Sequence, residues 1–100
     1  MSVKSDLASV RSFADQLRRH ARKAREYRND PYTPSKWTKE LSGFVFQSLV
    51  DLDGMNCHED VIAAKEDLVR AFGEFVRDFS AYCERSGVDP EPLLAQFPQI

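Results

Sequence analysis

Residues 3–28 read VKSDLASVRSFADQLRRHARKAREYR, and the spacing of their apolar side chains decides the fold. These side chains recur at steps of four and three, which places them on one face of an α-helix. They are Val3, Leu7, Val10, Ala14, Leu17, Ala21 and Ala24. Ser5, or Ser2 before it, is a candidate N-cap, and Pro31 and Pro34 prevent the pattern from continuing. The sequence therefore predicts a helix over residues 3–28, whose alanines allow a second helix to approach closely.

A second helix is predicted between the two prolines and Gly54. Thr33 or Ser35 can cap it, Pro34 is acceptable in its first turn, and its apolar residues extend over residues 37–52. Because these residues occupy more than one face, we expect this helix to be the central one, contacted by several neighbours. Gly54 suits a left-handed residue after the last turn.

A third helix is predicted at about residues 57–86. Asn56 with Glu59 three residues later resembles a capping box, and Ser86 with Gly87 ends the helix. Its seam is apolar, and with the second helix it supplies five phenylalanines that we expect to be buried. They are Phe44, Phe46, Phe72, Phe75 and Phe79. A short helix then begins at the Asp89-Pro90-Glu91 signal and carries Leu93, Leu94 and Phe97, which we expect to cover one end of the bundle.

The fold class predicted from these segments is all-α, an antiparallel up-down-up three-helix bundle with a short fourth C-terminal helix. With 100 residues, 42% of them hydrophobic, the chain can bury one core, so residues 1–100 are expected to form a single helical-bundle domain. Cys57 and Cys83 are too few for a disulfide framework, and both are expected to be reduced. No secretory signal or long apolar run occurs, so we expect a cytoplasmic protein with no membrane association.

Charge is distributed unevenly along the chain. Residues 1–40 hold ten Lys and Arg against five Asp and Glu, whereas residues 41–100 hold four against eleven. The first helix carries a basic stripe in which four residues lie seven apart, and further cations widen the stripe near the helix end. The stripe consists of Lys4, Arg11, Arg18 and Arg25, and the added cations are Arg19, Arg22, Lys23 and Arg28. Such asymmetry indicates either a charged partner or pairing within the chain.

Three interpretations of the basic stripe remain open. It can pair with an acidic stripe of the third helix, Asp60, Asp67 and Glu74, with each exposed pair adding about 0–1 kcal/mol. It can bind a protein with a complementary charged face, or a second copy of the chain. It can also bind the phosphates of a nucleic acid, although the pI near 5.6 and the absence of a recognisable nucleic-acid module disfavour this.

Aromatic residues lie on both sides of the predicted loop between the first two helices. Tyr27, Tyr32 and Trp37 are close in sequence to four cations, and Arg together with aromatic residues is typical of protein interfaces. These cations are Arg25, Arg28, Lys36 and Lys39. Packing of the same rings against the end of the bundle is an equally good interpretation.

Catalytic and metal chemistry find little support in the sequence. Cys57 to Asp60 offers four potential metal ligands, but adjacent residues at a helix start point in different directions and cannot converge on one ion. A nucleophile and base pair of Cys57 with His58 meets the same objection. His20 shares a helix face with Phe13 and Tyr27, which indicates packing rather than catalysis. No cofactor or metal is predicted.

The function predicted from the sequence is that of a small non-enzymatic helical protein that binds a macromolecule, most simply another protein. Inhibitors, immunity-type proteins of bacteria or phages, and accessory or regulatory subunits are of this kind, although no motif here matches any of them. The alternative is a nucleic-acid-binding module that uses the basic face of the first helix. The candidate binding residues are Arg11, Arg18, Arg19, Arg22, Lys23, Arg25, Arg28, Tyr32 and Trp37.

Overall fold

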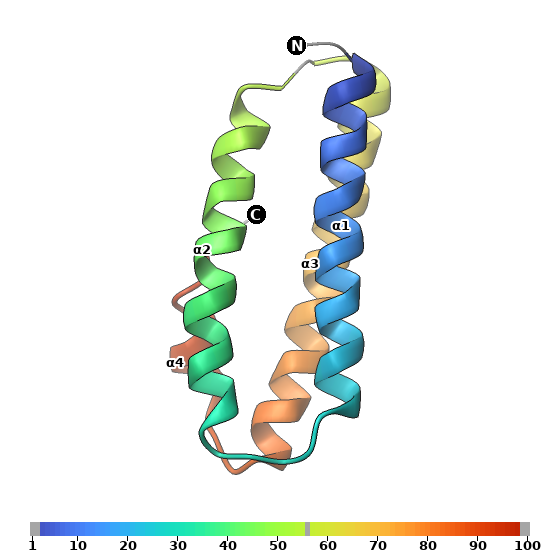
Figure 1. Ribbon diagram of the computed structural model, residues 1–100. Coiled ribbons are helices and arrows are strands. Elements are labelled where there is room, and N and C mark those ends of the chain that lie inside the picture. The colour runs from blue at the N-terminus through green and yellow to red at the C-terminus, as the bar shows by residue number, and fades with distance from the viewer. Residues whose placement is uncertain (1–2, 56, 99–100) are drawn as a thin grey trace.

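Four helices account for most of the computed structural model, which describes residues 3–55 and 57–98 (Figure 1). The helices are α1 (Val3–Glu26), α2 (Thr33–Asp53), α3 (Glu59–Arg85) and α4 (Pro90–Leu94). In Figure 1 the chain descends through α1, ascends through α2 and descends again through α3, with α4 beside the lower part of α2. The molecule measures 44 × 21 × 15 Å. The predicted all-helical class and helical-bundle packing are confirmed.

The side chain of Asp30 stabilises the loop between α1 and α2 at the start of α2, where the sequence had predicted a cap by Thr33 or Ser35. Asp30 Oδ1 accepts the backbone N–H of Tyr32 at 2.9 Å, and Oδ2 accepts the hydroxyl of Thr33 at 2.8 Å. These bonds stabilise the carboxylate and hold the pKa of Asp30 below its usual value. Because α2 begins at Thr33 itself and its cap residue Tyr32 accepts no hydrogen bond with its side chain, the prediction of Thr33 or Ser35 as the cap is wrong.

Two other predicted helix signals are also wrong. Ser5 lies inside α1, because the helix already begins at Val3, and Ser2 lies outside the described residues. Gly54 follows α2 with a φ of −91°, so its backbone is not left-handed. The turn there closes by hydrogen bonds from Gly54 and Met55 to the carbonyls of the last helical turn.

Side-chain caps begin α3 and α4, and a glycine follows the end of α3. His58 caps α3, with Nδ1 accepting the backbone N–H of Asp60 at 3.1 Å, while the predicted cap Asn56 lies outside the described residues. Gly87 after α3 has a φ of +76°, a left-handed conformation that favours glycine. Asp89 caps α4 as predicted, by accepting the backbone N–H of Glu91 at 3.1 Å.

The pair α1 and α3 forms the tightest contact in the fold. The alanines of the α1 face are buried, and Ala71 of α3 is fully buried as well. Small side chains let the two helix backbones approach closely, as the sequence predicted for a neighbour of α1. In Figure 1 α3 lies behind the upper part of α1 and emerges to the left of α1 further down.

In contrast, α2 is held away from the α1–α3 pair by large aromatic side chains. Trp37 reaches from α2 to Phe79 of α3, with ring centroids 5.7 Å apart, and Phe44 meets Phe13 of α1 at 5.9 Å. The expectation that this helix is the central one is wrong, since α3, and not α2, makes the extensive contact with α1. Phe46 and its neighbour Val50 are 62% and 51% exposed on α2, so the prediction that Phe46 is buried is also wrong.

The core is an aromatic cluster centred on α3. Phe75 and Phe79 are fully buried and stack with centroids 5.3 Å apart, whereas Phe72 and Phe44 are only half-buried at the edge. Phe97, which follows α4, contacts Phe75 at 5.7 Å. The C-terminal segment therefore folds back onto the bundle, but it packs against the side of α3 and α2, so the prediction that it covers one end of the bundle is wrong.

Candidate interaction surface

The cations of α1 divide into two groups according to whether α3 neutralises them. Arg18 makes a bidentate pair with Asp67 of α3, both N–O distances being 2.9 Å, and its Nε lies 3.4 Å from Glu74. Arg25 Nη1 lies 2.7 Å from Oδ2 of Asp78. The pairing between basic and acidic stripes that the sequence offered as one interpretation is thus present at Arg18. Both arginines are already engaged within the fold.

The ion pair between Arg18 and Asp67 shifts the pKa of both groups, but both side chains remain in contact with solvent. The hydrogen bonds from Arg18 lower the pKa of Asp67, and the same bonds raise the pKa of Arg18. Both side chains keep more than a third of their surface exposed, at 35% and 45%. Solvent and salt screen such a pair, so we assign it about 0–1 kcal/mol of stability.

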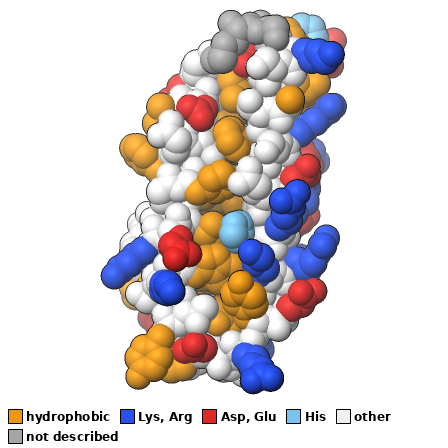
Figure 2. All heavy atoms as spheres, in the orientation of Figure 1, with side chains coloured by type: hydrophobic (Ala, Val, Ile, Leu, Met, Phe, Trp, Pro, Cys, Tyr) orange, Lys and Arg blue, Asp and Glu red, His pale blue; other side chains and the backbone are white. Residues whose placement is uncertain are grey.

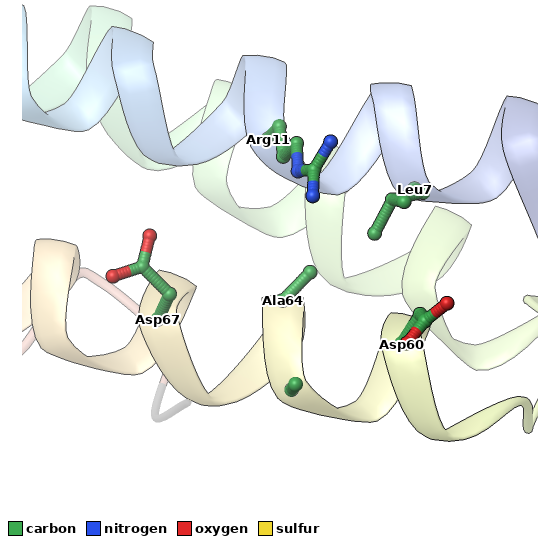
Figure 3. A pocket seen from close by; sticks show the side chains of 6 residues that line it. Leu7, Arg11, Asp60, Ala64 and Asp67 are labelled. Carbon is green, nitrogen blue, oxygen red and sulfur yellow. The ribbon is translucent and has the colours of Figure 1, made fainter.

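Arg11 lies among acidic residues of α3. In Figure 3 its guanidinium projects from α1 toward α3, where Asp60 and Asp67 lie to either side. The groove there has a volume of about 460 Å³, and its apolar lining includes Leu7 and Ala64. No ion pair joins Arg11 to a carboxylate in residues 3–55 and 57–98, so the ladder between the two stripes is incomplete at this level.

The second group of cations forms no ion pair with α3. We define the outer basic face as Arg19, Arg22 and Lys23, all of which are exposed and make no ion pair with any described residue. Asp15 and Glu26 lie on the same side of α1 and reduce its charge in part. Figure 2 shows Lys and Arg side chains gathered along the edge of the molecule that α1 forms. This face keeps positive charge that the fold does not use.

The remaining predicted binding residues lie elsewhere. Arg28 is exposed in the loop after α1, where its backbone carbonyl accepts the hydroxyl of Tyr82 at 3.2 Å. Tyr32 is 82% exposed in the same loop, whereas Trp37 is only 7% exposed. The structure therefore does not bring Tyr32 and Trp37 together as two exposed interface anchors.

Trp37 instead forms the floor of a pocket between α1 and α2, which we call the aromatic pocket. Its volume is about 270 Å³, and in Figure 2 this part of the surface shows a His side chain and hydrophobic side chains between the two helices. The lining residues are His20, Lys23, Tyr27, Thr33, Lys36, Trp37 and Glu40. The indole N–H of Trp37 donates to Nδ1 of His20 at 3.3 Å. The predicted packing role of His20 agrees with this contact.

Burial and the nearby positive charge of Lys23 lower the pKa of His20 below 6.5. Both causes disfavour the protonated ring. At neutral pH His20 is therefore uncharged, and its unprotonated Nδ1 can accept the hydrogen bond from Trp37.

The depressed pKa of His20 predicts an acid-sensitive fold. Between the folded pKa and the value of 6.5, the unfolded chain binds more protons than the folded chain. The free energy of unfolding should therefore fall as the pH decreases from about 7 to about 5, with the loss beginning near the unfolded pKa. Urea unfolding across this range, followed by circular dichroism, measures it.

His20→Gln is the matched variant, because an amide oxygen can accept the Trp37 N–H at any pH. We expect it to flatten the pH dependence over this range. A wild-type stability that is constant over the range, or an NMR titration that puts the His20 pKa at or above 6.5, would contradict the assignment.

Other chemistry-bearing groups do not form a reactive site. Burial raises the pKa of the Cys83 thiol to about 11, which disfavours its reactive thiolate, and Cys57 is an exposed free cysteine. Among the described residues, no three His, Cys, Asp or Glu side chains gather as a metal site.

No helix among the described residues has the length and apolarity needed to span a membrane. No protein-family model, curated protein or solved structure matches the chain.

Proposed function

We propose that this chain is a non-enzymatic protein whose up-down-up helical bundle presents the outer basic face of α1 to a protein partner. The observation that carries the proposal is the division of the α1 cations. Arg18 and Arg25 are paired with α3, whereas Arg19, Arg22 and Lys23 are exposed and unpaired among the described residues. An acidic surface of another protein would supply the counter-charges that this chain lacks.

The electrostatics favour a protein over a nucleic acid as the partner. Asp15 and Glu26 interrupt the outer basic face, and the whole chain has a net charge of −2. Both would repel a continuous phosphate backbone. A protein surface can place its acidic groups opposite the cations and avoid the two carboxylates. Charge complementarity of this kind sets the association rate and the choice of partner, as an inhibitor or accessory subunit requires.

Charge reversal tests the proposal. The double variant Arg19→Glu, Arg22→Glu should reduce capture of the partner from native cells by at least about tenfold, because it replaces attraction with repulsion at the contact. The helical spectrum should be unchanged, since neither arginine has an ion pair in the described structure. Capture is quantified by affinity pull-down and mass spectrometry.

The matched control is Lys39→Glu, Arg70→Glu, which changes the net charge equally on α2 and α3. We expect this control to capture the partner normally. Equal loss in both variants would show an unspecific charge effect, and no loss in either would refute the proposed face. Retention of mixed DNA with a log–log salt slope of about −0.9 per phosphate contact would instead establish the nucleic-acid alternative. Self-association lost only in the Arg19, Arg22 variant would identify a second copy as the partner.

A further inference from the structure

We infer that the aromatic pocket between α1 and α2 is the anchor site for an acidic peptide segment of the partner, which inserts one apolar side chain against Trp37. The inference rests on the proposed function and specifies the part of the partner that is recognised. It follows from the size of the pocket, the chemistry of its floor and the charges at its mouth.

The size and floor of the pocket fit a single apolar side chain. About 270 Å³ lies just below the range of pockets that hold whole small-molecule ligands. Tyr27 packs against Trp37, with centroids 5.2 Å apart and ring planes inclined by 34°, so the two rings form one continuous aromatic surface of the pocket. Tyr27 is 43% exposed, so part of its surface is available to an incoming group. Aromatic side chains are typical of the contacts that dominate interface energetics.

The polar groups of the floor already satisfy one another. The Trp37 N–H is bonded to His20 Nδ1, and the Thr33 hydroxyl is bonded to Asp30. No buried side-chain N or O atom in the described residues lacks a hydrogen-bond partner. An apolar side chain can therefore enter without leaving a polar group of the floor unpaired, which would otherwise cost affinity.

The mouth of the pocket favours negative charge on the segment that carries this side chain. Lys23 from α1 and Lys36 from α2 are both exposed in the lining, against the single carboxylate of Glu40. The lowered pKa of His20 leaves its ring neutral, so the net positive charge of the pocket comes from the two lysines. The outer basic face, of which Lys23 is part, continues this charge along α1. A peptide with carboxylates on either side of its apolar residue would match both features.

Trp37 offers a direct readout because it is the only tryptophan in the chain. We would titrate the purified protein with the peptide Asp-Glu-Phe-Glu-Asp, blocked at both ends, and follow the tryptophan fluorescence. A saturable change is expected. Asp-Glu-Ala-Glu-Asp should bind more weakly because it lacks the apolar anchor, and Lys-Lys-Phe-Lys-Lys should bind more weakly because its charge is reversed.

Two pairs of variants localise the binding. Tyr27→Ala and Lys36→Glu should each weaken binding of Asp-Glu-Phe-Glu-Asp by about fivefold or more, since one removes part of the aromatic surface and the other reverses a mouth charge. The matched controls are Tyr32→Ala and Lys39→Glu, which change an exposed tyrosine and lysine outside the lining and should bind within about twofold of the wild type. Lys36 is exposed, so its variant separates lost binding from lost folding if Tyr27→Ala loosens the core.

The outcomes distinguish the pocket from the proposed function. If the acidic peptide leaves the fluorescence unchanged, or the basic peptide binds more tightly, the inference is wrong. A thymidine oligonucleotide that binds more tightly than the peptide also overturns it. Normal partner capture by Tyr27→Ala and Lys36→Glu, together with loss in the Arg19, Arg22 variant, would refute the pocket while the proposed function survives. Peptide binding in the expected order, with normal capture by the Arg19, Arg22 variant, would refute the proposed face instead.

Discussion

Phe75→Ala is expected to lower the free energy of unfolding by about 3–5 kcal/mol, because truncation removes buried apolar area and leaves a cavity. Phe75 is fully buried, and its ring contacts those of Phe79, Phe97 and Trp37 at 5.3, 5.7 and 6.2 Å. These contacts join α3 to α2 and to the segment after α4, so no single neighbour can fill the space. Urea unfolding with a constant m-value measures the loss.

Phe46→Ala is the matched control for this experiment. The same truncation is made on α2, but the side chain is 62% exposed, so the change should be within about 0.5 kcal/mol. Similar losses at the two positions, or a loss below about 1 kcal/mol at Phe75, would show that the aromatic cluster is not the core.

The second large effect is expected at Arg25. Asp78 faces it from α3 with a side chain that is only 11% exposed, and the other cation near this carboxylate is Arg77, at 3.8 Å. Arg25→Ala leaves a largely buried carboxylate without its 2.7 Å partner, which should cost about 1–3 kcal/mol. Thermal or urea unfolding measures the change.

Arg18→Ala provides the comparison, because its partner Asp67 is 45% exposed and water can replace the lost bond. That variant should cost about 0–1 kcal/mol. Removing both charges with Arg25→Leu, Asp78→Leu should recover much of the loss of Arg25→Ala, since no buried charge remains. If Arg25→Ala costs no more than Arg18→Ala, the burial of Asp78 has no energetic consequence.

The sequence predicted the features that depend on periodicity along a single helix. The steps of four and three from Val10 to Ala24 identified the buried face of α1, and the alanines on it indicated the close contact with another helix. The seven-residue spacing of the basic stripe and of the acidic stripe also indicated the pairing of Arg18 with Asp67 and Glu74. Asp78 was missed because it follows Glu74 by four residues and falls outside that spacing, although alternation of three and four would have included it.

Features that depend on how helices cover one another could not be predicted in this way. Phe46 lies in an apolar run, but periodicity does not reveal whether another helix covers that side of α2. The position of Trp37 near the loop left both an interface role and packing against the bundle open, and the structure shows that it packs inward against His20 and Phe79. The aromatic pocket therefore emerged only from the packing of α1 against α2.

The close contact between α1 and α3 also constrains the order in which the chain can fold. Hydrogen bonds from Arg18 to Asp67, from Arg25 to Asp78 and from Arg85 to the Ala24 carbonyl join residues 49, 53 and 61 positions apart. During synthesis α1 leaves the ribosome long before α3, and α2 offers it only a looser, aromatic contact. The alanine face of α1 can then be buried only after α3 has been made, so the close contact between these helices forms through residues that are distant in sequence.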